Sequence, residues 1–175
     1  MAQLPIITAP DPRLKIKAQP VPEVDDKIRR LMDDMLETMY AAIGVGLAAP
    51  QVGQSSRVIV LDIARDGEKP QPMKLANPEI LWRSRELTTG DEGCLSLPEH
   101  YAEVTRPAAI RLRYLDYQNE IREIEASALL STCLQHEIDH LDGVLFVDHI
   151  SSLKRGMILR KLAKAKRSRV PATAA

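Results

Sequence analysis

The sequence predicts an α+β fold, in which helices near both ends of the chain enclose antiparallel or mixed sheets packed around a central helix. Three observations predict it: helical spacing of apolar residues after Asp25 and after Ser151, strand-like segments between residues 57 and 124, and a further helical stretch over residues 129–141. With 175 residues and 45% apolar content, the chain is long enough to form a single catalytic domain, residues 1–175, around one core.

The N-terminal region predicts an extended segment followed by a helix. Residues 1–22 contain five prolines, which disfavour regular structure. Asp25 is a suitable N-cap, and the helix is expected to end at Gly44. Its apolar residues follow the three-and-four spacing of one buried face: Ile28, Leu31, Met32, Met35, Leu36, Met39 and Ile43.

Residues 44–53 (GVGLAAPQVG) follow this helix as a glycine-containing loop. Two glycines one residue apart let the backbone come close to another group, and Pro50 favours a turn. The loop lacks the G-x-G-x-x-G spacing of a dinucleotide site. By itself it predicts a packed turn, in which Gln51 is a polar residue without an assigned role.

The middle of the chain predicts antiparallel strands joined by short loops. The segments that predict strands are residues 57–64, 73–76, 80–85, 109–116 and 121–124. The last two are separated by residues 117–120, a spacing typical of a hairpin. Residues 91–98 (DEGCLSLP) predict a break between strands, where the thiol of Cys94 need not belong to the core.

His136, Glu137 and His140 form an H-E-x-x-H motif within the third helical stretch. Histidines four residues apart project from the same helical face, where both imidazoles can bind one metal ion. Glu137 follows the first histidine and is placed to act as general base for a hydrolytic water. The alternative is a polar helix with two unrelated histidines and an ordinary apolar stripe, consisting of Leu129, Leu130, Cys133, Leu134, Ile138 and Leu141. We interpret both the stripe and the metal site as real, because a buried helix holds two ligands rigidly.

A third metal ligand is needed, and the sequence after the motif does not supply one. Phe146 stands where the last histidine of an H-E-x-x-H-x-x-G-x-x-H protease would stand, and no glutamate follows Glu137. The ligand must therefore come from upstream, which favours Cys94. Cys133 precedes His136 by three residues and lies on a neighbouring helical face, so we assign it to packing or to a pocket wall.

The cysteine content and the apolar pattern predict the cellular compartment. Two cysteines provide no disulfide framework, which is typical of a reducing compartment. The N-terminal residues lack the basic and apolar regions of a signal peptide, and no apolar run reaches membrane-spanning length. We therefore expect a cytoplasmic protein without a membrane partner.

Three segments in this order, GVGLAAPQ (residues 44–51), EGCLS (92–96) and QHEIDH (135–140), resemble the three motifs of the peptide deformylase family. The resemblance implies that Cys94, His136 and His140 hold one divalent metal ion, and that this ion is iron (Fe2+). A ligand set of two histidines and one cysteine is also typical of Zn2+, and the resemblance implies that Ni2+ or Co2+ can substitute.

The resemblance further implies hydrolysis of the N-formyl group from the formyl-methionine of newly synthesised polypeptides, with release of formate. Glu137 is then the general base, and the Gln51 amide and the Leu95 backbone N–H donate hydrogen bonds to the oxyanion. The residues expected to contact the substrate are Gly44, Val45 and Gly46 in the glycine loop and Leu129 and Cys133 in the methionine pocket.

Two places depart from the family pattern. Gly90 and Asp91 stand where many members have a larger apolar residue and an acid, which concerns one wall of the methionine pocket. His100 and Tyr101 stand where some members place an arginine that contacts substrate. Neither departure affects the chemistry.

Two other functions are compatible with parts of the sequence. The first is a zinc endopeptidase that shares the H-E-x-x-H chemistry, although the missing downstream ligand argues against it. The second is a non-catalytic, metal-stabilised module that binds the ribosome or RNA through its basic end. A structural metal site is usually closed by four protein ligands, and the sequence supplies three.

The charges are divided unevenly along the chain. Residues 1–150 hold 16 of the 24 Lys and Arg and all 24 Asp and Glu, a balance of −8, whereas residues 151–175 hold 8 basic residues and no acid. We expect a basic C-terminal helix, capped by Ser151 or Ser152, with a tail. Its expected docking stripe consists of Leu153, Met157, Ile158 and Leu162.

The basic side chains of this C-terminal helix predict a partner rich in phosphate. They are Lys154, Arg155, Arg160, Lys161, Lys164, Lys166 and Arg167. The expected partner is the ribosome near its exit tunnel, where formylated chains emerge, and no feature predicts binding to a specific DNA sequence. The alternative is a solvated helix end without a partner.

Overall fold

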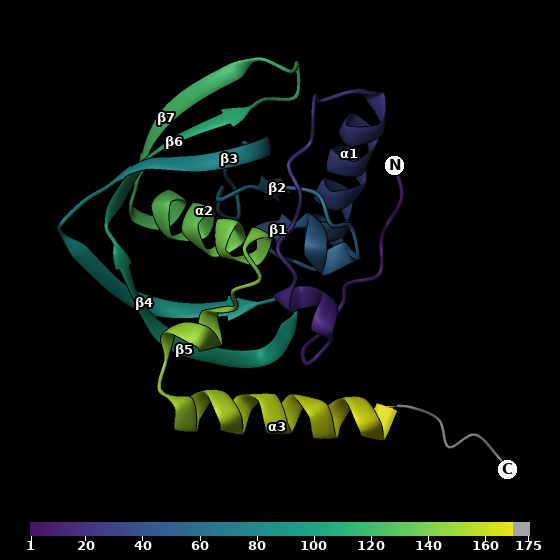
Figure 1. Ribbon diagram of the computed structural model, residues 1–175, viewed down its shortest axis with the longest axis vertical. Coiled ribbons are helices and arrows are strands. Elements are labelled where there is room, and N and C mark those ends of the chain that lie inside the picture. Colours follow the sequence, from purple (N-terminus) through teal and green to yellow (C-terminus); the bar gives the residue numbers. More distant parts are fainter. Residues whose placement is uncertain (170–175) are drawn as a thin grey trace, which may run out of the picture.

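The structure is a computed structural model that describes residues 1–169, and it has the α+β architecture that the sequence predicts (Figure 1). Its helices are α1 (Asp26–Ala41), α2 (Ala128–Leu141) and α3 (Ser152–Arg169). Its strands are β1 (Gly46–Ala48), β2 (Val58–Leu61), β3 (Met73–Arg83), β4 (Leu87–Cys94), β5 (Leu97–Pro107), β6 (Ala109–Leu115) and β7 (Ile121–Ser127). Short 3-10 helices span Pro12–Lys15, Ala49–Val52 and Phe146–His149.

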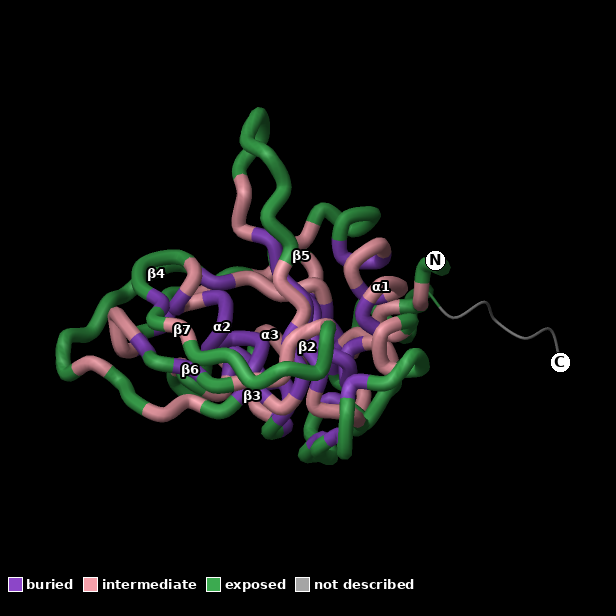
Figure 2. Tube along the Cα trace, turned by 90° about the horizontal axis from the view of Figure 1, so that it is seen from above, coloured by how far each residue is buried: buried purple, intermediate pink, exposed green. Residues whose placement is uncertain are grey.

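The strands form two antiparallel sheets with α2 between them. One sheet has five strands in the order β1-β2-β3-β6-β7, and the other is the β4-β5 hairpin. Figure 1 shows α2 lying between the five-stranded sheet and the hairpin. The helix that carries the H-E-x-x-H motif is therefore covered on both sides, and most of its residues from Cys133 to Leu141 are buried (Figure 2).

The apolar side chains gather in three clusters, each of which anchors one helix. Leu134, Ile138 and Leu141 attach α2 to the five-stranded sheet. The methionines of α1 pack against strands β1 and β2 in a second cluster. In the third cluster, Leu162 of α3 meets Phe146 and residues of β5 and of the N-terminal segment.

Helix α1 begins as predicted and ends earlier than predicted. The Asp25 carboxylate accepts a hydrogen bond from the Ile28 backbone N–H at 2.9 Å, which makes Asp25 the N-cap. Beyond Ala41 the chain leaves the helix, and Ile43 adopts a φ of 57° with its side chain 93% exposed. The assignment of Ile43 to the buried stripe was therefore wrong, because the left-handed backbone at this residue turns its side chain outward.

The bounds of several strands differ from the predicted ones. The two strands expected over 73–76 and 80–85 are one strand, β3, with an irregular register near Asn77, whose φ is 49°. The strand expected over 57–64 ends at Leu61, since the Asp62 carboxylate accepts hydrogen bonds from the backbone N–H groups of Ala64 and Gln71. The last strand continues past residue 124 to Ser127.

The β4-β5 hairpin was not predicted as a pair of strands. Residues 87–91 are all exposed, so the outer half of β4 has no apolar alternation from which a strand could be predicted. Cys94 is the last residue of β4, and the break expected around it is the tight connection to β5. Gly93 pairs with Tyr101, and both line the same cavity as His136 and Glu137 of α2, so this end of the hairpin lies beside that helix.

Helix α3 lies along the outside of the molecule (Figure 1). Ser151 Oγ accepts a hydrogen bond from the Lys154 N–H at 3.3 Å, as expected for an N-cap. The docking stripe was partly wrong, because Leu153 and Met157 are 71% and 45% exposed. Arg155 bonds inward to Asp148 at 2.8 Å, which turns the face with Ile158, Leu159 and Leu162 toward the body.

Residues 170–175, part of the predicted basic tail, lie outside the described residues. Among the helices of residues 1–169, none is long and apolar enough to cross a membrane.

Candidate metal centre and active site

Helix α2 and strand β4 bring three metal-ligating side chains together. His136 and His140 are one helical turn apart, with ring centroids separated by 5.1 Å, and both are buried. The Sγ atom of Cys94, at the end of β4, lies 3.3 Å from His140 Nε2. The ligand atoms of Cys94, His136 and His140 all lie within 4.8 Å of one another. The spacing allows one metal ion to contact all three.

A buried ion pair orients the first histidine. Glu92 Oε1 lies 2.9 Å from His136 Nδ1, and since an ionised carboxylate only accepts, Nδ1 carries the hydrogen and Nε2 keeps its lone pair. Arg106 holds the same carboxylate through Nε and Nη2, at 2.6 and 2.8 Å. Burial alone would raise the pKa of Glu92, but the hydrogen bonds from Arg106 and His136 lower it to about 2.

The donor set suits a divalent metal of intermediate softness. One thiolate and two neutral imidazoles are ligands typical of Fe2+, Zn2+, Ni2+ or Co2+. Burial and the neighbouring His136 lower the pKa of His140 well below its usual value, which keeps that ring neutral. Burial also disfavours the charged form of His136, although its contacts with Cys94 and Glu92 raise its pKa when no metal is present. The three side chains therefore fit a metal ion and leave coordination positions for substrate and water.

Glu137 lies beside this group with an oxygen that no neighbour satisfies. It is buried, and its Oε2 atom has no hydrogen-bond partner among the described residues. Burial raises the pKa of Glu137 to about 7, an effect that the charge of His136 opposes. A buried carboxyl group with a pKa near neutrality is suited to accept and return a proton.

The glycine loop touches Glu137 directly. A Cβ atom added to Gly46 would lie 2.5 Å from Glu137 Oε1, and one added to Gly44 would lie 2.7 Å from Leu95 Cδ1. Glycine at these two positions is therefore required by contacts within the protein.

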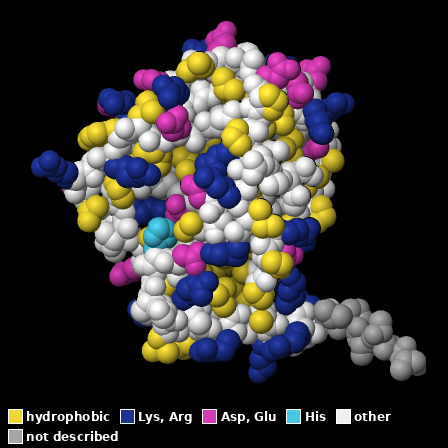
Figure 3. All heavy atoms as spheres, in the orientation of Figure 1, with side chains coloured by type: hydrophobic (Ala, Val, Ile, Leu, Met, Phe, Trp, Pro, Cys, Tyr) yellow, Lys and Arg dark blue, Asp and Glu magenta, His cyan; other side chains and the backbone are white. Residues whose placement is uncertain are grey.

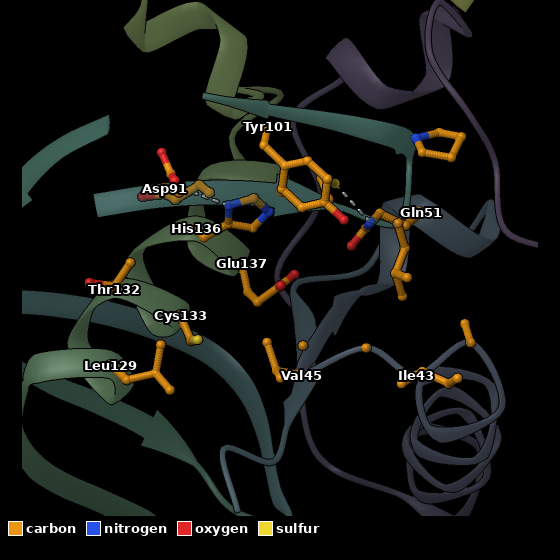
Figure 4. Close-up of a pocket in the computed structure, with 18 of the residues that line it drawn as sticks. Ile43, Val45, Gln51, Asp91, Tyr101, Leu129, Thr132, Cys133, His136 and Glu137 are labelled. Carbon is orange, nitrogen blue, oxygen red and sulfur yellow. Dashed lines mark hydrogen bonds and ion pairs between the residues drawn. The ribbon is translucent and has the colours of Figure 1, made fainter. Parts of the chain in front are cut away.

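The side chain of Gln51 is fixed with its amide nitrogen toward the metal ligands. Its Oε1 atom accepts a hydrogen bond from the Ala48 N–H at 2.9 Å, which defines the orientation of the amide. Its Nε2 atom donates to Ser96 Oγ at 3.0 Å and contacts Cys94 Sγ at 3.5 Å. A hydrogen-bond donor is therefore held next to the reactive centre, as Figure 4 shows.

A cavity of about 480 Å³ opens in front of Glu137 and His136. Figure 4 shows Val45, Leu129 and Cys133 along one side of it. Cys133 is buried, whereas Leu129 and Val45 are 44% and 50% exposed at the rim. Burial raises the pKa of the Cys133 thiol to about 12, so this sulfur is an uncharged part of the wall.

Of the four residues that depart from the family pattern, two line this cavity and two do not. Tyr101 and Asp91 line the cavity, whereas Gly90 and His100 do not. The Tyr101 ring lies against Gly93, where a Cβ atom would come within 2.5 Å of it. Gly90 is exposed and has open space around it.

Arg106, Ser96 and the contact between Glu92 and His136 were not predicted from the sequence. Glu92 is the first residue of the EGCLS segment. Its position two residues before Cys94 on a strand places both side chains on one face, but strand β4 was itself not predicted. No local pattern marks Arg106, whose role depends on the β5 strand that follows.

The α+β fold, the group of Cys94 with the buried His136 and His140, and the adjacent glutamate together define a metal-dependent hydrolase. The family model for polypeptide deformylase matches residues 3–156. The chain is 60% identical over 164 residues to a peptide deformylase of Methylocella silvestris, covering 92% of this chain and 84% of that relative. It is 57% identical to a peptide deformylase of Phenylobacterium zucineum, covering 94% and 97% of the two chains.

A solved structure agrees with these relatives. The crystal structure of peptide deformylase from Ehrlichia chaffeensis in complex with actinonin superimposes with a TM-score of 0.91 at 42% identity, covering 95% of this chain and 99% of that one. The chain belongs to the polypeptide deformylase family, and its activity is removal of the N-formyl group from newly synthesised polypeptides. The hypotheses of a zinc endopeptidase and of a non-catalytic module do not agree with this assignment.

Proposed function

We propose that Cys94, His136 and His140 hold one Fe2+ ion and that Glu137 is the general base of the deformylation. The observation that carries the proposal is the convergence of the three ligand atoms within 4.8 Å, next to the unpartnered carboxylate oxygen of Glu137. The bound ion would supply Lewis acidity to the formyl oxygen and to the hydrolytic water. Zn2+, Ni2+ and Co2+ fit the same ligands.

Glu137 moves the proton in the proposed hydrolysis. Its carboxylate accepts a proton from the attacking water, and the resulting hydroxide forms a bond to the formyl carbon to give the tetrahedral intermediate. Glu137 then returns the proton to the departing amine, so that formate and a free N-terminus are formed. A pKa of about 7 supports both steps near neutral pH.

Gln51 and Leu95 stabilise the negative oxygen of the tetrahedral intermediate in this proposal. The Gln51 Nε2 atom is already oriented by the Ala48 N–H and lies 3.5 Å from Cys94 Sγ. The backbone N–H of Leu95 follows the ligand Cys94 directly in the sequence. Two donors fixed before the reaction cost no reorganisation when the charge develops.

The cavity suits the methionine side chain of the substrate. Val45, Leu129 and the uncharged Cys133 provide an apolar wall that favours an unbranched apolar side chain and disfavours a charged one. We propose that Gly44 and Gly46 keep the backbone close to the formyl carbon, so that a larger acyl group such as acetyl does not fit.

The experiment is anaerobic purification, followed by metal analysis and a formate-release assay. The proposal predicts about one iron per chain, rapid release of formate from a formyl-Met peptide, and a much lower kcat/KM for the matching formyl-Asp peptide. Equal kcat/KM for the two peptides would contradict the pocket assignment. Full activity of a metal-free protein would contradict the metal assignment.

We also propose that α3 attaches the enzyme to the ribosome in the cytoplasm, near the tunnel exit. The helix has no acidic residue, and its basic side chains other than Arg155 are exposed. Figure 3 shows Lys and Arg side chains gathered on the part of the surface where α3 lies. Ribosomal RNA presents phosphates that such a surface binds in a salt-dependent way.

A further inference from the structure

A chain of charged hydrogen bonds continues from the metal centre to the surface. Beyond Glu92 and His136, the third nitrogen of Arg106, Nη1, donates to Asp139 Oδ2 at 2.9 Å. The same Asp139 oxygen lies 2.8 Å from Nε2 of His149, whose side chain is 35% exposed. The path therefore runs from His149 through Asp139, Arg106 and Glu92 to His136.

These contacts close a ring between the helix and the hairpin. His136 and Asp139 are three residues apart on α2, so both face the same side. Glu92 comes from β4 and Arg106 from β5. Because Cys94 is two residues from Glu92 on β4, the ring fixes the strand that carries the sulfur against the helix that carries both histidines.

The ring contains two carboxylates, Glu92 and Asp139, and one guanidinium, Arg106. Arg106 is buried and is the single positive partner of the two carboxylates among the described residues other than the histidines. One nitrogen of Arg106 donates to Asp139, so the single positive charge of Arg106 is shared between two carboxylates. The negative charge of Glu92 is therefore only partly neutralised, and Glu92 still accepts a hydrogen bond from His136. A carboxylate that accepts from the non-coordinating nitrogen of a histidine makes that histidine a better metal ligand.

His149 completes the outer end of the chain. Asp139 is an acceptor when ionised, so Nε2 of His149 must carry the donated hydrogen. Arg106 and His149 thus meet at a single oxygen and hold the Asp139 side chain in one rotamer. His149 belongs to the 3-10 helix Phe146–His149, which lies directly before α3.

We propose that Asp139 and His149 are positioning residues of the metal centre, acting through Arg106 and Glu92 on the orientation of His136 and of strand β4. Neither side chain is among the residues that line the active-site cavity. The inference rests on the proposed ligand set. Asp142 provides a matched control, because it lies near Asp139 at the end of α2 but its side chain pairs with Arg57 at 2.9 Å and makes no hydrogen bond to the side chains of the ring among the described residues.

The test uses Co2+ as the probe, bound to the full-length protein and to four variants: Asp139→Asn, His149→Leu, His149→Gln and Asp142→Asn. The measured quantities are the dissociation rate of Co2+ into a chelator, the cobalt–thiolate absorption band, and the separate kcat and KM for a formyl-Met peptide. Thermal unfolding of each metal-free variant measures general destabilisation independently.

Asp139→Asn should speed Co2+ dissociation by about 10-fold and shift the absorption band, with a fall in kcat and little change in KM. His149→Leu should change the same properties to a smaller extent. His149→Gln should behave nearly like the unmodified protein, because the glutamine amide can also donate a hydrogen bond to Asp139. Asp142→Asn should leave all the metal properties unchanged.

Unchanged Co2+ dissociation and absorption in both Asp139→Asn and His149→Leu would overturn the inference. Equal effects of Asp139→Asn and Asp142→Asn would also overturn it, since they would indicate a general effect of charge at the helix end. If the unmodified protein gives no cobalt–thiolate band, the proposed ligand set itself is wrong. This failure of the proposed function is distinguishable from the two results that overturn the inference on Asp139 and His149, because those compare variants with an unmodified protein that does give the band.

Discussion

At the scale of single residues, the two cysteines differ in what surrounds their sulfur atoms. Cys94 Sγ lies 3.3 Å from His140 Nε2, 3.4 Å from the Ser96 backbone nitrogen and 3.5 Å from the Gln51 amide nitrogen, so it faces polar groups. Burial raises the pKa of Cys133 to about 12, and the nearby charge of Glu137 acts in the same direction. One sulfur is therefore suited to bind metal and the other to line a pocket.

The first prediction compares the two sulfurs. Cys94→Ser should weaken metal binding and abolish most activity, whereas Cys133→Ser should retain a full equivalent of metal. Metal content after anaerobic purification is the measurement. Equal loss of metal in both variants would mean that the wrong sulfur has been assigned to the centre.

The second prediction concerns the contact between the glycine loop and the general base. A methyl group at Gly46 would meet Glu137 Oε1 at 2.5 Å, so the carboxylate must move. Gly46→Ala should therefore lower kcat by about 100-fold while the metal stays bound. Gly90→Ala is the matched control, since no atom lies within 4 Å of the added group. A Gly46→Ala enzyme with the kcat of this control would show that the carboxylate position is not critical.

At the scale of elements, the parts that the sequence predicted well are those with a strong apolar period. Helix α2 has apolar and candidate ligand residues at helical spacing, and its extent of Ala128–Leu141 includes the whole apolar stripe from Leu129 to Leu141 that predicted it. The outer half of β4 is exposed, so the β4-β5 hairpin could be recognised only from its pairing and from the contacts of Glu92 with His136 and of Arg106 with Asp139 on α2. The candidate ligands could therefore be proposed from the sequence, whereas Glu92 and Arg106, which contact them or their neighbours, could not.

The way α3 packs on the body could likewise be predicted only in part, because it depends on a residue outside the helix. An apolar stripe on the helix could be found from spacing, but which apolar residues face the body depends on Asp148, a residue outside the helix. The Asp148 carboxylate accepts hydrogen bonds from the Leu145 N–H at 2.9 Å and from Arg155 at 2.8 Å, and it also pairs with Lys15. It thus joins the N-terminal segment, the Phe146–His149 turn and α3.

The third prediction concerns the pH dependence of this junction. Burial would raise the pKa of Asp148, but its hydrogen bonds to the Leu145 N–H, Lys15 and Arg155 lower it below the ordinary value of 3.8. A lowered folded-state pKa means that the stabilisation is present above pH 3.8 and is lost as the pH falls through the folded-state value.

Asp148→Asn should therefore lower the free energy of unfolding by about 1–3 kcal/mol at neutral pH, and the difference should shrink below pH 3.8. Urea titrations at several pH values measure it. Asp26→Asn is the control, because the Asp26 side chain is 92% exposed and, among the described residues, its one ion pair is with Arg29. A difference that does not depend on pH would contradict the role of the charge.

At the scale of the whole molecule, an acidic body carries a basic helix on one side. Residues 1–150 have a charge balance of −8, and the 8 basic residues that follow are opposed by no acid. Leu162 and its neighbours hold α3 to the body, so its exposed basic side chains are presented on a fixed surface. We propose that the chain forms one catalytic domain and that α3 is its docking element.

The fourth prediction separates docking from chemistry. Deletion of the chain from Lys164 onward should leave hydrolysis of a short formyl-Met peptide unchanged and should weaken co-sedimentation with ribosomes. The double variant Lys161→Gln with Lys164→Gln, which keeps the helix, should also bind less and with a smaller dependence on salt. If the truncated protein co-sediments as well as the full chain at low and moderate salt, α3 is a solvated helix without this partner.

The central claim is that Glu137 performs the proton transfers beside a metal ion that it does not bind. The most direct measurement combines metal content, the kcat for formate release and the thermal stability of Glu137→Gln, which preserves the shape of the side chain. The account predicts an unchanged metal content, an unchanged fold and a loss of at least about 100-fold in kcat. A Glu137→Gln enzyme that keeps its metal and releases formate at a nearly normal rate would contradict it.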